Sequence, residues 1–260
     1  MAPTFNIRFP DSRIVMQWIY HFNRPPLNGK QVAVLTQDAL NYLPRSRVIE
    51  FPKGFVLYEP GRPPEQLSLV LGGRVKLSAV GEDGSSIVLR IAGPEEFLGE
   101  SALIPPLDSP RESGTVLECA QLMNWTAEEL SRHIENEPRL GAALFRYFGS
   151  CNRRVLARLA AQAAYRCSDR VMLSLVELAR QLGTPQPDGS LRVCGLTHQT
   201  IAEFVCTSRE IVTAEMNRLR REGFLTYSRR FTDVFADNLA EHLRSQGIPA
   251  SRSASLQVAM

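Results

Sequence analysis

The hydrophobic pattern of this chain changes its period at Thr126, and that change constrains the fold more than any other feature. From Arg47 to Thr126, short runs alternate apolar and polar residues, whereas beyond Thr126 apolar residues recur every three or four positions. The first pattern is typical of strands and the second of amphipathic helices. Because a run of strands precedes a run of helices, we expect an α+β fold. The 260 residues, 44% of them hydrophobic, suffice for about two domains.

The alternating half predicts a small β-barrel or sandwich. Turn residues bound each run, and Asp83-Gly84 between two runs is a strong hairpin signal. We assign residues 35–137 to this domain and residues 1–34 to an N-terminal extension of unassigned function. The runs are VIEF, FVLYEP, LSLVLGGRVKLSAV, SSIVLRIA and SGTVLECAQLMNW.

A long helix is predicted over residues 138–166. Thr126 and Glu129 form a capping-box pattern for a shorter helix before it, and Pro138 begins the long one. One apolar stripe runs along it with spacings of four, four, three, four and four. A narrow stripe on a long helix is typical of pairing with a second copy, which predicts a homodimer, although the stripe could instead pack on the barrel of the same chain. The stripe consists of Leu140, Leu144, Phe148, Cys151, Val155 and Leu159.

A second domain is expected over residues 167–245, followed by a loose tail over 246–260. Ser168 is expected to cap its first helix, which ends at Gly183. Further on, the segment 196–230, LTHQTIAEFVCTSREIVTAEMNRLRREGFLTYSRR, predicts two short helices joined by a tight turn and followed by a two-stranded wing.

The boundaries of these two helices follow from their caps. Thr197 can cap the first helix, and Thr207 with Glu210 fits a capping box for the second. Gly223 supplies the left-handed residue that ends the second helix. Three apolar residues of the second helix are expected to face the first one: Ile211, Met216 and Leu219.

The opposite face of the second helix carries side chains that suit base edges in a DNA major groove. Arg209 can donate two hydrogen bonds to guanine, Glu210 can accept one from cytosine, and Thr213 can meet a thymine methyl group. Ser208 precedes them at the same end. The simplest alternative for Glu210 is a capping role alone.

Groups suited to phosphate surround this face. The start of the first helix and the basic residues after it can bind the DNA backbone. A solvated helix face is the alternative for the arginines, because the net charge of the chain is only +3. The expected phosphate contacts are His198, Gln199, Thr200, Arg218, Arg229 and Arg230.

With these features in place, the chain resembles the Crp/Fnr family of bacterial transcription regulators. The resemblance rests on FPKGFVLYEPGRPPEQLSLVLGGRVKLS and FLGESALI, followed by the long helix and the helix-turn-helix, and it covers about residues 35–240. It implies a cyclic-nucleotide-binding-like sensor of double-stranded β-helix or jelly-roll type and a winged helix-turn-helix. It also implies a homodimer on a palindromic operator in double-stranded DNA, a small-molecule effector in the barrel, and RNA polymerase as a partner.

Two positions depart from the family pattern. Many members carry an arginine four residues after the glutamate of the recognition helix, where this chain has Ala214, so one base contact is expected to be missing. In members that bind cyclic AMP, Gly-Glu holds the ribose and Arg-Ser clamps the phosphate. Here Glu112 follows Arg111 directly, and its charge would repel a phosphate. A cyclic nucleotide is therefore a cofactor candidate with a degenerate clamp, at Gly99, Glu100, Ser101, Arg111 and Ser113.

Other chemistries find little support in the sequence. The five cysteines (Cys119, Cys151, Cys167, Cys194 and Cys206) are scattered, without zinc spacing or an N-terminal cluster for iron and sulfur, so we expect reduced thiols and no metal. His21 and His133 are isolated, which disfavours haem. An enzyme with a cupin-like barrel would need histidines on its strands, where none lies. We expect a cytoplasmic protein that is not an enzyme, the alternative being a nucleotide-binding regulatory protein whose helix-turn-helix contacts other proteins.

Overall fold

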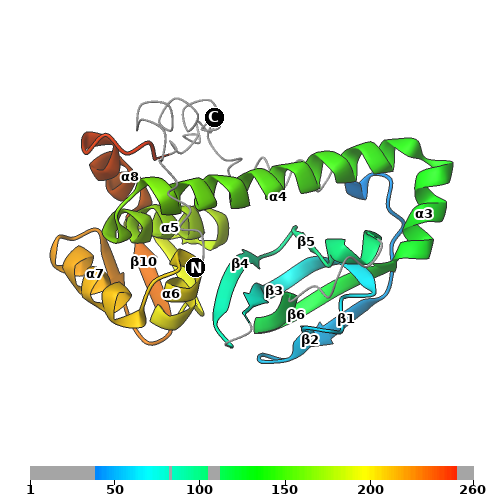
Figure 1. Ribbon diagram of the computed structural model, residues 1–260, viewed down its shortest axis with the longest axis horizontal. Helices are drawn as coiled ribbons and strands as arrows, with labels where there is room; N and C mark the ends of the chain where they lie inside the picture. Colours follow the sequence, from blue (N-terminus) through cyan, green and yellow to red (C-terminus); the bar gives the residue numbers. More distant parts are fainter. Residues whose placement is uncertain (1–38, 82–83, 105–111, 251–260) are drawn as a thin grey trace, which may run out of the picture.

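A β-sheet lobe and a helical lobe lie on the same side of one long helix, α4 (Pro138–Ala164) (Figure 1). The computed structural model describes residues 39–81, 84–104 and 112–250. The expected extension over 1–34 and Arg111 lie outside these ranges, as does most of the tail. The mixed α+β fold agrees with the sequence-based prediction. No helix in the described ranges is long and apolar enough to cross a membrane.

The sheet lobe is built on two long antiparallel strands whose pairing is interrupted by register shifts. Strands β3 and β6 pair along most of their length, with register shifts around Gly72 and Arg74. Gly73, at φ +78°, lies so close to the Cys119 carbonyl that a residue with a side chain would not fit there. The strand order is β1-β6-β3-β4, with β2 on β6 and β5 on β3. The strands are β1 (Val48–Phe51), β2 (Val56–Tyr58), β3 (Gln66–Val80), β4 (Ser86–Ala92), β5 (Phe97–Leu98) and β6 (Glu112–Thr126).

Alternating side chains on β3 place one hydrophobic core inside this sheet and another between the sheet and the central helices. Val70 belongs to the inner core with Leu98 and Leu122. Leu67 and Leu69 point to the other face and pack with residues of α3 (Ala127–Asn136) and α4. The predicted capping box is present, since Thr126 accepts from the Glu129 backbone and Glu129 accepts from the Thr126 backbone.

The apolar stripe expected on α4 does not face solvent along its first half. Leu140, Leu144 and Cys151 are buried in the core between α4 and the sheet, and Phe148 packs against it. The alternative of packing on the same chain therefore applies to these four residues. The assignment of these four residues to a dimer interface was wrong. A spacing of three and four occurs on whichever face a helix buries, whether against its own chain or a partner.

The helical lobe combines four helices with a small antiparallel sheet of order β7-β8-β10-β9. The predicted two-stranded wing corresponds to β9 and β10, and two further strands extend it. The prediction that Ser168 caps the first helix is wrong, because α5 begins at Cys167 and Arg166 precedes it without a side-chain cap. The elements are α5 (Cys167–Leu182), β7 (Thr184–Pro185), β8 (Leu191–Cys194), α6 (His198–Val205), α7 (Arg209–Arg221), β9 (Leu225–Tyr227), β10 (Phe231–Val234) and α8 (Ala236–Ser245).

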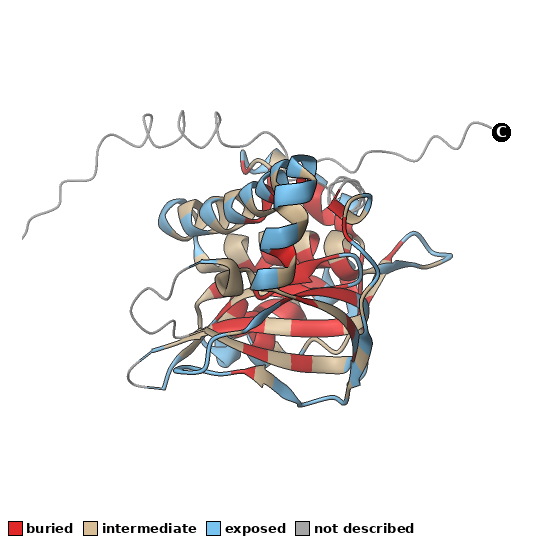
Figure 2. Ribbon diagram, turned by 90° about the vertical axis from the view of Figure 1, so that its right-hand side faces the viewer, coloured by how far each residue is buried: buried red, intermediate tan, exposed pale blue. Residues whose placement is uncertain are grey.

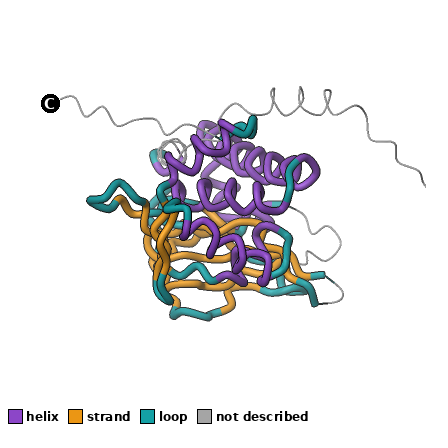
Figure 3. Tube along the Cα trace, turned by 90° about the vertical axis from the view of Figure 1, so that its left-hand side faces the viewer, coloured by secondary structure: helices purple, strands orange, loops and turns teal. Residues whose placement is uncertain are grey.

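The two lobes share a core. Val88 and Ile91 of β4 are fully buried in one cluster with residues of α5 and α6. Arg74 of β3 donates to the carbonyls of Leu182 (2.7 Å) and Cys194, which lie at the ends of α5 and β8. Figure 2 shows that buried residues continue from the strands into the helices, and Figure 3 shows the helices gathered on one side of the strands.

Candidate nucleic-acid interface and effector site

Two short helices, α6 and α7, meet at a tight turn in the helical lobe. Thr197 caps α6 as predicted, because its hydroxyl accepts a hydrogen bond from the Thr200 backbone at 3.0 Å. Cys206 ends α6 in the left-handed conformation (φ 56°), which is uncommon for a residue with a side chain and makes the turn sharp. This geometry fixes the direction in which α7 leaves α6.

The start of α7 lies one residue later than the sequence pattern indicated. Ser208, not Thr207, is the N-cap, and its hydroxyl accepts from the Ile211 backbone at 3.3 Å. The Thr207 backbone instead donates to Ala202 at 3.0 Å and completes the turn. Glu210 thus comes second in the helix and forms no capping box. Hydrogen bonds from its own backbone N–H and from Ser208 lower the pKa of its exposed carboxyl.

The side of α7 that packs on the domain is formed by Val212, Glu215, Met216 and Leu219, all of which are buried. The assignment of Met216 and Leu219 to this side was correct. Ile211 was misassigned, because its side chain is 46% exposed. Adjacent helix positions differ by about 100°, so Val212 fills the place expected for Ile211.

Four expected base-reading residues lie together at the N-terminal end of α7. Ser208, Arg209 and Glu210 are exposed, and Thr213 is half-exposed one turn on. The Thr213 hydroxyl donates to the Arg209 carbonyl at 2.8 Å and lies 2.9 Å from the Nδ1 atom of His198. Thr213 therefore joins the start of α6 to α7. Its hydroxyl has no remaining hydrogen to donate.

His198 links three elements of this surface. Its ring meets that of Tyr227 on β9 edge-on, with centroids 5.3 Å apart, and the Tyr227 hydroxyl donates to Asn217 of α7 at 2.8 Å. Burial, followed by the charge of Arg209, lowers the pKa of His198 below its usual value. Because the Thr213 hydrogen is already donated, the Nδ1–H of His198 donates to Thr213, and the neutral ring has no second N–H for a phosphate. A phosphate contact by neutral His198 would therefore use its backbone N–H at the start of α6.

The residues expected to contact phosphate differ in how free their side chains are. Gln199 is exposed and donates to Glu203 at 3.0 Å, whereas Thr200 is buried, so its side chain does not reach a phosphate. Arg218 forms ion pairs with both Glu215 and Glu222, which neutralise its charge and raise its pKa. Two of the six expected contacts are therefore disfavoured by the structure.

The wing keeps its cations exposed. Arg229 and Arg230 lie in the turn between β9 and β10, where the Ser228 hydroxyl accepts from the backbones of Arg230 (3.2 Å) and Phe231 (3.3 Å). A hydrogen-bonded turn with two exposed arginines, next to a strand that contacts α7 through Tyr227, is suited to the DNA backbone.

A second candidate site lies in the barrel, around the turn after β5. Gly99 has φ +85° and lies against the Gln66 carbonyl, so only glycine fits there. Glu100 follows it and accepts two hydrogen bonds from the Arg90 guanidinium, at 2.8 and 2.9 Å. Ser113 is half-buried on β6 opposite Ser78, and the Ser101 hydroxyl is buried nearby. The sequence pattern did not single out Arg90, although an arginine within the apolar run SIVLRIA could have marked it.

This barrel site already contains its own counter-ions. The Tyr58 hydroxyl donates to Glu112 at 3.1 Å. Burial raises the pKa of Glu112, and the nearby carboxylate of Glu100 raises it further. The Arg90 guanidinium is therefore already paired with Glu100, and an incoming anion would have to displace that carboxylate.

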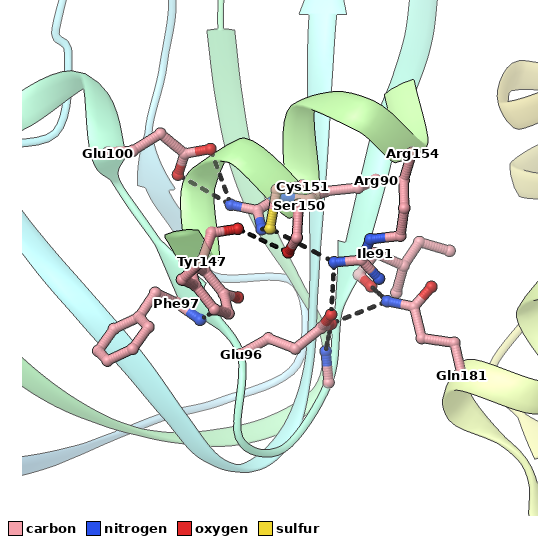
Figure 4. Close-up of polar contacts among 11 residues, drawn as sticks. Arg90, Ile91, Glu96, Phe97, Glu100, Tyr147, Ser150, Cys151, Arg154 and Gln181 are labelled. Carbon is pink, nitrogen blue, oxygen red and sulfur yellow. Dashed lines mark hydrogen bonds and ion pairs between the residues drawn. The ribbon is translucent and has the colours of Figure 1, made fainter. Parts of the chain in front are cut away.

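A chain of polar contacts connects the barrel site to the helices (Figure 4). Arg90 and Arg154 both contact the Cys151 sulfur of α4, at 3.5 and 3.4 Å. Arg154 also pairs with Glu96 at 3.0 Å, and Glu96 accepts from Gln181 of α5 at 2.8 Å. The three elements β4, α4 and α5 are therefore joined by largely buried polar side chains.

Groups for other chemistry are sparse in the described part of the chain. All five cysteines are free thiols. No group of three His, Cys, Asp or Glu residues there is arranged to hold a metal ion. His133 lies on α3, and His21 falls outside the described residues.

Comparison with known proteins identifies both domains. Residues 48–137 match the cyclic nucleotide-binding domain, and residues 154–240 match the Crp-like helix-turn-helix domain. The CRP-like cAMP-activated global transcriptional regulator of Mycobacterium tuberculosis is 30% identical over 68% of this chain and 79% of its own. The chain belongs to the Crp/Fnr family. It is accordingly a transcription regulator that binds DNA and carries a sensor domain, as the sequence-based resemblance implied.

Solved structures of the family share this architecture. A CRP/FNR family regulator from Thermus thermophilus is 25% identical, with a TM-score of 0.62 over 75% of this chain and 98% of its own. The c-di-GMP responsive global regulator CLP of Xanthomonas campestris, at 20% identity, has the same fold, with a TM-score of 0.63 over 78% of this chain and 99% of its own.

Proposed function

We propose that this regulator binds an inverted-repeat operator as a homodimer, with α7 of each subunit in a major groove. The exposed end of α7, with Arg209 and Glu210, supports this proposal more than any other observation. Arg209 would donate to guanine and Glu210 would accept from cytosine. Gln199 and His198 at the start of α6, with Arg229 and Arg230 in the wing, would bind the flanking phosphates.

The solvent-facing side of α4 supplies a surface for the second subunit. One set of its exposed positions alternates spacings of three and four, as in a coiled-coil seam. They include large apolar side chains, since Phe145 is 79% exposed, Leu156 43% and Leu159 60%. Asn152 in the middle of the seam is a polar residue of the kind that fixes register. The seam consists of Ala142, Phe145, Gly149, Asn152, Leu156, Leu159 and Ala163.

This seam replaces most of the interface expected from the sequence. Leu159 belongs to both sets, and Val155, which is half-exposed, lies at the edge. A two-fold axis along the seam would relate the two α7 helices, and such dimers contact half-sites about one duplex turn apart. An inverted repeat follows from that symmetry.

Selection from random duplex DNA with the full chain tests the proposal. We expect enrichment of an inverted repeat and, by mass measurement of the complex, two chains per duplex. Failure to enrich any sequence at low salt would contradict DNA reading and favour a helix-turn-helix that contacts proteins. Enrichment of a single half-site with one chain bound would contradict the dimer.

We propose that the barrel is the regulatory input, with an effector that differs from a simple cyclic nucleotide monoanion. The Arg90–Glu100 pair supports this reading, because a phosphate would have to displace the Glu100 carboxylate from the guanidinium. The two relatives named above are described by different effectors, cAMP and c-di-GMP. Thermal shift with cyclic AMP, cyclic GMP and cyclic di-GMP tests it. Stabilisation by cyclic AMP at micromolar concentration would contradict the proposal.

The remaining assignments follow from action on DNA. A regulator of bacterial promoters acts in the cytoplasm, where the DNA lies, and RNA polymerase bound beside the operator is the expected partner.

A further inference from the structure

The recognition helix exposes one large apolar side chain that no assigned role uses. Ile211 is 46% exposed, and among the described residues from 167 to 250 it is the only large hydrophobic side chain that is exposed. Every other one in this domain is buried or partly covered. Ala214, three residues on, is also exposed. Residues three apart are neighbours on a helix, so the two form one apolar patch.

The patch lies beside the groups that would read bases. Glu210 and Ala214 are four residues apart and lie in one row along α7, with Ile211 next to that row. Arg209 and Thr213 form the opposite edge. The face that would enter the groove is therefore polar on one edge and hydrocarbon on the other.

Thr213 is poorly placed to supply the apolar contact. Its hydroxyl is held by the Arg209 carbonyl and by His198, which fixes the side chain against the start of α6. Ile211 has no such restraint on its side chain, because only its backbone N–H is engaged, with Ser208. The small side chain of Ala214 leaves room for a base edge to approach Ile211.

We propose that Ile211, with Ala214, reads the 5-methyl group of a thymine next to the base pairs read by Arg209 and Glu210. The thymine methyl is the apolar group in the major groove, and only T·A and A·T pairs present it. Where many members of the family have an arginine, this chain has a hydrocarbon surface, so its half-site contains an A·T pair there. This inference rests on the proposed DNA-binding function.

Deoxyuridine substitution tests the proposal directly, because it removes the methyl group and leaves base pairing unchanged. Each thymine of the operator selected with the full chain is replaced in turn by deoxyuridine, and the dissociation constant is measured. Covering one methyl group corresponds to about a fourfold change in affinity. We expect that loss at one thymine per half-site for the unmodified protein, and about 15-fold when both half-sites are changed.

Three variants identify the side chain involved. Ile211→Ala should bind the thymine and deoxyuridine operators equally. Thr213→Ser removes the Thr213 methyl but retains the bonded hydroxyl, so its sensitivity to deoxyuridine should persist. Ile87→Ala truncates an isoleucine of similar exposure (44%) on the barrel and should behave as the unmodified protein does. Far-UV circular dichroism should confirm that Ile211→Ala is folded, since alanine favours a helix.

Two results would overturn the inference. Deoxyuridine without effect at every thymine would show that no methyl group is read. Loss of the deoxyuridine effect in Thr213→Ser but not in Ile211→Ala would assign the contact to Thr213. In both cases the operator is still bound, so either result differs from a failure of the proposed function, in which no operator would be selected.

Discussion

Arg218 and Arg229 have the same side chain but different electrostatic surroundings. Arg218 is held between Glu215 and Glu222, whereas Arg229 projects from the wing turn. A guanidinium already paired with two carboxylates contributes little net charge to a nearby phosphate. At the scale of single residues, therefore, position on a basic surface does not by itself identify a DNA contact.

Truncation of Arg209 and truncation of Arg229 should weaken DNA binding in different ways. Arg209→Ala should weaken binding to the selected operator by about 5- to 150-fold, because a bidentate contact to guanine contributes about 1–3 kcal/mol. It should scarcely change binding to unrelated DNA. Arg229→Ala should weaken binding to all sequences and lower the salt dependence by about one ion. Titrations at several salt concentrations measure both effects, and equal losses on all sequences for Arg209→Ala would contradict its role.

At the scale of elements, α4 has two apolar faces with different partners. Leu140, Leu144 and Cys151 pack on the barrel, whereas Phe145, Leu156 and Leu159 face solvent. The helix therefore has a buried face within its own chain and a second face free to bind another copy. This division makes the two faces separable by mutation.

Substitution on each face of α4 should have a distinct outcome. Leu159→Arg places a charge in the exposed seam and should convert the dimer into a folded monomer with unchanged helix content. Leu144→Ala leaves a cavity in the core and should cost about 2–5 kcal/mol in the free energy of unfolding. Analytical ultracentrifugation and urea denaturation distinguish them. A dimer that persists in Leu159→Arg at micromolar concentration would contradict the seam.

The sequence predicted the elements of the DNA-binding lobe better than their faces. Thr197, Gly223 and the wing turn were identified because caps and turns depend on local chemistry. The start of α7 was placed one residue early because Thr207 and Ser208 are both good caps, and the left-handed Cys206 decides between them. Because Ser208 is the cap, Val212 and not Ile211 faces the interior of the domain.

The barrel site was predicted only in part, for a related reason. The turn at Gly99 and Glu100 was identified from the family pattern. Arg90 and Tyr58 come from other strands, and the pairs that they form with Glu100 and Glu112 depend on strand register. Spacing along the chain carries no information about such pairs.

At the scale of the whole molecule, a network of buried polar side chains joins the sensor domain to the DNA-binding domain. Arg154 on α4 pairs with Glu96 after β4, and Glu96 also accepts from Gln181 of α5. An effector that displaced Arg90 from Glu100 would act on the same cluster through Cys151. We therefore expect the barrel and α5 to respond together to such an effector.

Breaking this cluster should cost more than breaking a surface pair. Arg154→Met leaves the Glu96 carboxylate buried with its guanidinium partner removed, and should lower the free energy of unfolding by about 3–5 kcal/mol. Arg139→Ala removes an exposed pair with Glu137, formed at 2.8 Å, and should leave the free energy of unfolding nearly unchanged. Urea denaturation measures both, and equal effects would contradict a structural role for the cluster.

The core shared by the two lobes has a consequence for cooperativity. Val88 and Ile91 belong to the barrel by sequence but are buried among residues of α5 and α6. A barrel cut away at the boundary between the two matched domains would expose these side chains to water and leave the Arg74 guanidinium without its carbonyl partners. The two domains match separate family models but share a core, so we expect them to unfold as one cooperative unit, with loss of structure in one lobe lowering the stability of the other.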